Sequence, residues 1–252
     1  MRDLRKRFGG LHAVDGASFS VRRGTVTALI GPNGAGKTTA FNLVTGFIRA
    51  DAGHVRFAEH DISRRRPDHI ARLGMVRTFQ LTRVLAKMKV IENVMLAAPD
   101  QPGESFGRAL FQPRRWRRRE AEVHEEAMEL LAEVGIHTHA DEYAATLSGG
   151  QRKLLELARA LMTHPRLVLL DEPMAGVNPT LGRRLLDYLQ RLREERGLTV
   201  LFVEHDMDVV MGVSDEVIVM AQGQVIARGT PDQVRADERV IDAYLGAEPA
   251  AA

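Results

Sequence analysis

Mostly apolar runs of four to six residues alternate along the chain with segments whose apolar residues recur every three or four positions. The runs at 26–30, 167–170 and 198–203 have the length and composition of buried strands. The periodic segments, best developed at 123–134 and 154–162, predict amphipathic helices. Strands that alternate with helices predict an α/β fold built on a mostly parallel sheet.

Shorter elements are expected around these. The segment 98–118 contains three prolines and two glycines, so the helix that ends at Gly135 is expected to begin only at Glu120. A hairpin over 216–228 is expected to turn at the Gln222-Gly223 pair. The remaining expected elements are a strand with its turn at 53–62, a helix at 68–74, a short apolar segment at 76–80, a helix at 181–195 and two short helices near the C-terminus.

The overall composition excludes several classes of protein. The chain has 252 residues, no cysteine, and 35 Lys and Arg against 33 Asp and Glu, a formal net charge of +2. The missing cysteines exclude disulfides, thiolate metal sites and cysteine nucleophiles, and the balanced charge gives no argument for nucleic acid. No apolar stretch approaches the roughly 18 residues that span a bilayer, and the basic N-terminus lacks the apolar core of a secretory signal. We therefore expect a protein that is soluble or peripheral to a membrane.

A glycine-rich segment follows the first buried strand and precedes a helical segment. It fits the full pattern G-x-x-x-x-G-K-[ST], and the strand and helix around it argue against a chance turn. Its glycines allow backbone N–H groups to face phosphate oxygens, and the helix points its positive end at the same place. We expect Lys37 to reach the β- and γ-phosphates and Thr38 to bind Mg²⁺. The phosphate loop comprises Gly31, Pro32, Asn33, Gly34, Ala35, Gly36, Lys37, Thr38 and Thr39.

Two carboxylates, Asp171 and Glu172, stand at the end of the buried strand 167–170. Ligands of open α/β sheets bind at the carboxyl ends of the strands. Asp171 is expected to hold Mg²⁺ through water, and Glu172 to orient or polarise the attacking water. Many strands end in an acidic residue, so this assignment depends on the phosphate loop in the same chain.

A second glycine pair opens a predicted helix in the segment Leu147-Ser148-Gly149-Gly150-Gln151. Taken alone, it is a helix with Ser148 as its N-terminal cap. The alternative is a second helix N-terminus that faces phosphate. Its place about 20 residues before the acidic strand favours the alternative.

Five motifs, taken in their order along the chain, resemble those of the ATPase subunits of ABC transporters, and the resemblance covers nearly the whole chain. In that family two nucleotide-binding domains meet head to tail, with ATP between the phosphate loop of one and the signature of the other. The resemblance therefore implies that Ser148, Gly150 and Gln151 contact the nucleotide of a partner chain. The motifs are the phosphate loop, Gln80 in Thr-Phe-Gln, the Ser148–Gln151 signature, the acidic strand, and His205 in Val-Glu-His-Asp.

The resemblance also implies roles that the residues alone do not give. Phe8 takes the position of the aromatic side chain that stacks on adenine, although on its own it reads as an ordinary core residue. Gln80 takes the position that couples Mg²⁺ and water to the membrane domain. His205 takes the position of a histidine on the γ-phosphate, whereas a lone histidine after a strand is more often structural.

A narrower set of segments resembles the ATPase subunits of branched-chain amino acid importers. Urea and amide importers and the lipopolysaccharide-export ATPase are close relatives that these segments separate poorly. Soluble ABC ATPases usually carry two such domains or a long coiled coil, and a GTPase would need an Asn-Lys-x-Asp motif, so both classes are disfavoured. The segments are Arg7–Leu11, Val76–Gln80, Val90–Asn93, Glu204–Met207 and Ala243–Gly246.

The resemblance implies one ABC ATPase domain over 1–246, with a helical subdomain at about 85–163 inserted in the α/β core, an antiparallel β part, and a flexible tail at 247–252. It implies a second ATPase subunit, identical or similar, and transmembrane permease subunits. A solute-binding protein is an indirect partner, and nucleic acid is not expected. The chain would then lie at the cytoplasmic face of the inner membrane as a peripheral ATPase that uses ATP and Mg²⁺.

The chain departs from the family pattern at two places and also contains one run of basic residues. Asn178 stands where the family usually has an aspartate, which is expected to weaken communication across the dimer without abolishing activity. The chain starts at Met1-Arg-Asp-Leu, where relatives have a full first strand, so either the start is truncated or the true start lies upstream, and a missing edge strand is expected to loosen the platform under Phe8. The basic run 114–119 reads as a solvated helix start, with contact to anionic lipid as the alternative.

Overall fold

The computed structural model describes residues 1–78, 84–99 and 113–245, with the backbone alone at 113–116. The chain divides into two compact units. The first unit comprises Met1–Arg77, Arg166–Pro173 and Gln190–Ala252, and the second comprises Thr78–Pro165 and Met174–Leu189. The proposed single domain with an inserted helical subdomain stays a prediction, and the tail at 247–252 lies outside the described residues.

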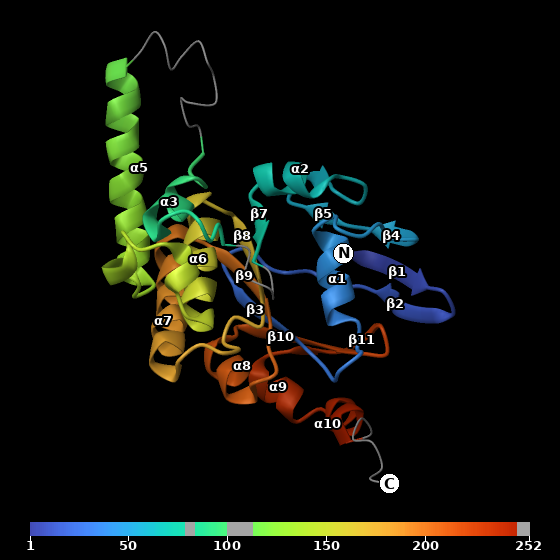
Figure 1. Cartoon of the computed structure of the whole chain (residues 1–252). Helices are drawn as coiled ribbons and strands as arrows, with labels where there is room; N and C mark the ends of the chain where they lie inside the picture. The colour runs from blue at the N-terminus through green and yellow to red at the C-terminus, as the bar shows by residue number, and fades with distance from the viewer. Residues whose placement is uncertain (79–83, 100–112, 246–252) are drawn as a thin grey trace. The chain divides into compact units, whose positions relative to one another are not determined.

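The first unit is built on a six-stranded sheet of order β11-β10-β3-β9-β8-β7 (Figure 1). All neighbours pair in parallel except β10 and β11, which form the expected hairpin. Every residue of β3, β8 and β9 is buried, as the apolar runs predict for the centre of a parallel sheet. The α/β prediction is confirmed. The strands are β3 (Val26–Ile30), β7 (Met75–Arg77), β8 (Leu167–Asp171), β9 (Thr199–Val203), β10 (Glu216–Ala221) and β11 (Gln224–Gly229).

A smaller antiparallel sheet of order β2-β1-β4 lies in the same unit. It consists of β1 (Arg2–Phe8), β2 (Leu11–Ala17) and β4 (Ala52–His54). Because β1 is hydrogen-bonded on both sides, the expected missing edge strand is wrong: Phe8 ends a central strand. A short pair, β5 (Arg56–Phe57) and β6 (His60–Asp61), follows β4.

The helix of the phosphate loop covers part of the large sheet. Its Phe41 is fully buried and shares one apolar core with Leu29 of β3 and Leu169 of β8. This packing fixes the start of the helix beside the carboxyl ends of the parallel strands. The helices of the first unit are α1 (Lys37–Val44), α2 (Pro67–Arg72), α8 (Met207–Val213), α9 (Pro231–Arg235) and α10 (Glu238–Leu245).

The second unit is helical. It contains α3 (Val90–Met95), α5 (Pro113–Glu133), α6 (Gly149–Met162) and the first part of α7 (Pro179–Arg196), and α3, α5 and α6 pack against one another. The expected helix start at Glu120 is wrong, since α5 already begins at Pro113. A proline is tolerated in the first turn of a helix, where its missing N–H leaves no bond unmade.

Two features of the described residues bear on contact with a membrane. Among the residues that the structure describes, none of the helices combines the length and the apolar character needed to cross a bilayer. Arg117 and Arg118 are exposed on α5, while the side chains of residues 114–116 lie outside the described residues. Lipid contact by the basic run stays a prediction.

Candidate nucleotide-binding site

The phosphate loop connects the end of β3 to the start of α1. Its Ala35 N–H donates to Pro32 O at 3.2 Å, which closes a turn inside the loop. The hairpin turn between β10 and β11 holds the loop from outside: Gly223 N–H donates to Ala35 O at 3.1 Å, and Asp15 N–H of β2 donates to Gly223 O at 2.9 Å. The six-stranded sheet and the β2-β1-β4 sheet therefore both hold the loop.

The last glycine of the loop is required by its surroundings. Gly36 has φ +97°, and a Cβ at this position would lie 2.3 Å from the carbonyl oxygen of Ala13. A larger residue would meet both a disfavoured backbone conformation and a steric clash with backbone. The motif glycine thus allows β2 to approach the loop closely.

The lysine of the loop lies folded onto its own loop. Lys37 Nζ donates to Gly31 O at 2.6 Å and to Pro32 O at 2.9 Å. Burial lowers the pKa of the Lys37 ammonium, and the negative charges of Glu172 and Asp171 oppose that shift. The first unit thus brings together the expected phosphate ligand and the two expected acidic residues.

Those two carboxylates differ in their surroundings. Asp171 ends β8 with 4% of its surface exposed, and its Oδ2 lies 2.7 Å from Arg77 Nη2. Glu172 has φ +48°, a conformation that non-glycine residues rarely adopt, and its N–H donates to Val203 O at 3.0 Å. Backbone strain of this kind costs about 1–3 kcal/mol and concentrates at functional sites.

The segment after β9 places the predicted histidine at the same sheet edge. The side chain of His205 is 74% exposed and its Nδ1 lies 3.6 Å from Oε2 of Glu204, whose side chain is 1% exposed. The His205 N–H also donates to that carboxylate at 3.1 Å. The histidine ring is therefore accessible to a ligand and is supported from below by a buried carboxylate.

The structure describes Phe8, the residue expected to stack on adenine, but not Gln80, the residue expected to couple to the membrane domain. Phe8 is 47% exposed, so its interpretation as a core residue is wrong, and an accessible ring is what stacking on a base requires. Lys6 Nζ lies 5.5 Å from the centre of that ring. Gln80 lies outside the described residues, and its predicted role stays a prediction.

Two contacts of the phosphate loop had no signal in the sequence. Burial raises the pKa of the Tyr244 hydroxyl of α10, and a hydrogen bond with the backbone of Gly31 opposes that shift. The turn at Gly223, described above, is the other contact. Both come from the last part of the chain, and local sequence patterns do not reveal such long-range partners.

The signature segment opens α6 in the second unit. Ser148 caps the helix: Gln151 N–H donates to its Oγ at 3.3 Å, and Ser148 N–H donates to Gln151 Oε1 at 2.9 Å. The Gln151 amide also lies 3.0 Å from Nε2 of His139. The N-cap interpretation is thus correct, and it leaves the exposed start of α6 available for a phosphate-facing role.

The two glycines of the signature should respond differently to alanine. A Cβ on Gly150 would lie 2.8 Å from Gly176 O, whereas one on Gly149 meets nothing within 4 Å. We expect Gly150→Ala to lower the free energy of unfolding by about 1–3 kcal/mol through overpacking. Gly149→Ala is the matched control and should change it by less than about 0.5 kcal/mol. Denaturant unfolding of the two variants measures this difference, and equal stabilities would contradict it.

The unusual asparagine has a local structural role. Asn178 Oδ1 accepts the N–H of Thr180 at 2.9 Å, and Asn178 O accepts the N–H of Gly182 at 2.9 Å. These bonds cap the start of α7, which an aspartate would also do. The predicted effect of Asn178 on communication across a dimer stays a prediction.

The donors expected for Mg²⁺ fit that ion in kind. A buried carboxylate at Asp171 and an exposed hydroxyl-bearing residue at Thr38 supply hard oxygen ligands. Within the described residues no cluster of three or more His, Asp or Glu forms a metal cage of its own. Mg²⁺ is usually bound by one or two carboxylates together with substrate phosphates, and the oxygen donors of Asp171 and Thr38 are of that kind.

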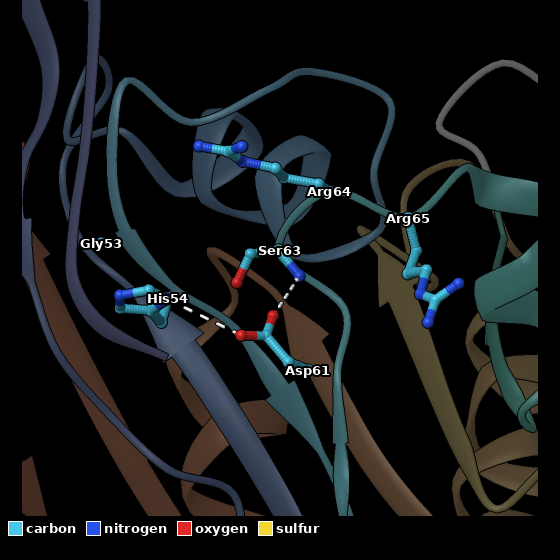
Figure 2. Close-up of a pocket in the computed structure, with 6 residues that line it drawn as sticks. All are labelled: Gly53, His54, Asp61, Ser63, Arg64 and Arg65. Carbon is cyan, nitrogen blue, oxygen red and sulfur yellow. Dashed lines mark hydrogen bonds and ion pairs between the residues drawn. The ribbon is translucent and has the colours of Figure 1, made fainter.

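A surface hollow in the first unit is distinct from these residues. It is lined by Gly53, His54, Asp61, Ser63, Arg64 and Arg65, and none of the predicted site residues takes part (Figure 2). Hydrogen bonds from Ser63 lower the pKa of Asp61, with a smaller contribution from the charge of His54. The Asp61 carboxylate in this hollow thus has its hydrogen-bond partner in the neighbouring Ser63.

Comparison with known proteins identifies the class. The sequence model of the ABC transporter family matches residues 14–175, which include the phosphate loop, the signature and the acidic strand. The fold and this match define an ATP-binding cassette, an ATPase that powers transport. The chain belongs to the ABC transporter family, and a second model, described as branched-chain amino acid ATP-binding cassette transporter, matches residues 224–250.

Curated relatives match over almost their full length. The chain is 44% identical to the high-affinity branched-chain amino acid transport ATP-binding protein BraF of Pseudomonas aeruginosa, over 96% of this chain and 95% of that protein. It is 42% identical to the probable branched-chain amino acid transport ATP-binding protein LivG of Archaeoglobus fulgidus, over 98% and 95%.

Solved structures agree with the fold. A nucleotide-free ATP-binding cassette from an ABC transporter aligns with a TM-score of 0.81 at 40% identity, over 96% of each chain. An ATP-binding cassette in its ADP conformation aligns equally well, over 97% of each chain at 40% identity.

Proposed function

We propose that the chain binds and hydrolyses ATP to power an importer of branched-chain or related amino acids. The names of the curated relatives support this cargo, and so does the match of residues 224–250 to the importer group. The chain would work with a second ATPase subunit and with transmembrane permease subunits, fed by a solute-binding protein. It would lie as a peripheral subunit at the cytoplasmic face of the inner membrane.

The observation that carries the proposal is the meeting of three strand ends in the first unit. β3, β9 and β8 are consecutive parallel neighbours, so their carboxyl ends lie at the same edge of the sheet. Gly31 comes directly after β3, His205 comes two residues after β9, and Asp171 is the last residue of β8. The phosphate loop starts there, and Lys37 lies within electrostatic reach of both acidic residues. Ligands of open α/β sheets bind at this edge.

Each residue has a chemical task in the proposed reaction, which is attack of water on the γ-phosphate of ATP. Lys37 would leave the carbonyl oxygens of its own loop and donate to the β- and γ-phosphates, where triphosphate charge favours its protonated form. Glu172 would orient the water and accept its proton, and His205 would donate to the γ-phosphate. Bound Mg²⁺ would neutralise charge that develops on the phosphates, held by Thr38 and Asp171, the latter through water. Catalysis of this kind is mostly positioning and charge stabilisation.

The signature completes the site only in a dimer. We place Ser148, Gly149, Gly150 and Gln151 against the nucleotide of the partner subunit, as the family resemblance implies. ATP then favours the closed dimer because that state binds ATP more tightly, and hydrolysis releases it. Hydrolysis by one isolated copy should accordingly be poor.

Capture of the assembled complex tests the proposal. A tagged chain isolated from membranes of its own host should recover permease subunits. In liposomes, the ATPase rate of that complex should rise when leucine, isoleucine or valine is added together with the solute-binding protein. Urea is the control ligand. Stimulation by urea and by none of the three amino acids would indicate that the chain serves a urea or amide importer. Recovery of ribosomal or chromosomal proteins without permeases would favour a soluble ABC ATPase.

A further inference from the structure

A buried arginine holds the acidic residue at the end of β8. The side chain of Arg77, the last residue of β7, is 6% exposed, and that of Asp171 is 3% exposed. Arg77 Nη2 donates to Asp171 Oδ2 at 2.7 Å. β7 and β8 are parallel neighbours in which Arg77 pairs with Leu169, so the arginine reaches two residues along β8 to the carboxylate.

The same guanidinium also reaches the helix of the phosphate loop. Arg77 Nη1 donates to Oδ1 of Asn42 at 2.6 Å, and the guanidinium carbon lies 5.5 Å from the centre of the Phe41 ring. Phe41 and Asn42 belong to α1, which begins with Lys37. One planar group therefore links the element that carries Lys37 to the carboxylate expected to serve Mg²⁺.

Stability is a weak explanation for this arrangement. Burial of two charges costs solvation that their attraction only partly returns, and apolar replacements of buried ion pairs are often neutral or stabilising. A guanidinium does provide fixed directions, because its donors form a rigid planar fork. The bonds to Asp171 and Asn42 use two arms of that fork and so set the position of the carboxylate relative to α1.

We propose that Arg77 is a positioning residue that fixes the Asp171 carboxylate against the phosphate-loop helix and thereby determines how much Mg²⁺ strengthens nucleotide binding. This proposal rests on the proposed roles of Asp171 and Thr38. Arg77 acts through Asp171 and touches neither nucleotide nor metal. Residues that orient metal ligands in this way typically change metal affinity by about 10- to 100-fold when replaced.

Neutralisation of charge is the competing explanation. Asp171 and Glu172 place two negative charges near Lys37, and Arg77 adds a second positive charge. If charge alone mattered, lysine would replace Arg77 without loss. If only repulsion of the metal mattered, removal of the arginine would strengthen Mg²⁺ binding. Positioning by the fork predicts a weaker effect of Mg²⁺ in both cases.

The test measures ADP affinity by calorimetry with Mg²⁺ and with EDTA in the purified full chain. For Arg77→Met we expect the Mg²⁺-dependent gain in ADP affinity to fall about 10-fold or more, with metal-free affinity changed less than about twofold. Arg77→Lys should lose most of the gain, because it keeps the charge without the fork. Arg72→Met, the same replacement at an exposed site on α2, should retain the parental gain.

Asn42→Ala keeps the ion pair and removes only the bond to α1, so it tests the proposal if Arg77→Met fails to fold. It should lower the Mg²⁺-dependent gain in the same direction by a smaller factor. A parental or larger gain in Arg77→Lys or Asn42→Ala would overturn the positioning role. If Mg²⁺ did not change the ADP affinity of the parental protein, the proposed metal site itself would be overturned. The experiment therefore distinguishes failure of the positioning role of Arg77 from failure of the metal site.

Discussion

Replacing Glu172 by glutamine should leave ATP binding intact and slow turnover by a factor of about 10³, within the range for loss of a general base. A glutamine side chain has nearly the same shape as glutamate, so the backbone at φ +48° gains no new clash. The backbone N–H of residue 172, which donates to Val203 O, is unchanged by the replacement. The lost property is the negative charge that orients the water and accepts its proton. Single-turnover hydrolysis and a fluorescent-nucleotide binding assay measure the two effects separately.

The control for this variant is the same replacement at a distant site. Glu125→Gln on the exposed face of α5 should hydrolyse ATP at the parental rate. A Glu172→Gln variant that also hydrolyses at the parental rate would remove Glu172 from the proposed mechanism. One that loses ATP binding as well would show that its main task is structural.

Lys37→Ala should cost about 3–4 kcal/mol of transition-state stabilisation, a 10²- to 10³-fold loss of ATPase activity, by analogy with removal of one preorganised donor. The ammonium lies close to Gly31 O and Pro32 O and is already partly desolvated, so its transfer to a phosphate needs little reorganisation. Steady-state ATPase assays measure the loss. Lys87→Ala, an exposed lysine outside the candidate site, is the control and should have parental activity.

Mixing two inactive variants tests whether the site is shared between subunits. A Lys37→Ala chain keeps an intact signature, and a Ser148→Arg chain keeps an intact phosphate loop. A mixed dimer therefore restores one complete site when each site uses both chains. ATPase activity well above that of either variant alone supports the head-to-tail arrangement, whereas no gain at saturating ATP would contradict it.

The sequence predicts those parts of the fold that depend on local pattern. The apolar run 26–30 and the glycines after it define β3, the loop and α1 within a few residues, because strand, turn and helix each have a local signal there. The serine before the glycine pair predicts the cap of α6 for the same reason. The ADP-conformation relative supports nucleotide binding for the family, while the individual roles of the site residues stay predictions.

The sequence fails where partners lie far apart in the chain. β1 has one buried residue, Leu4, among charged neighbours, so no apolar run announces the strand. The interpretation of Phe8 as a core residue failed because its exposure depends on the end of that strand. Arg77 likewise has no local signal, since its partners Asn42 and Asp171 are 35 and 94 residues away.

The contacts that hold the phosphate loop also determine when it forms during synthesis. β3 receives its two neighbours from β9 and β10, and the loop is tied to Gly223 and Tyr244, all of which are made late. Gly223 follows its loop partner Ala35 by 188 residues, which at about 5–20 residues per second delays this contact by roughly 10–40 s. A nascent chain on the ribosome therefore carries the complete phosphate-loop motif before the native contacts that hold the loop can form.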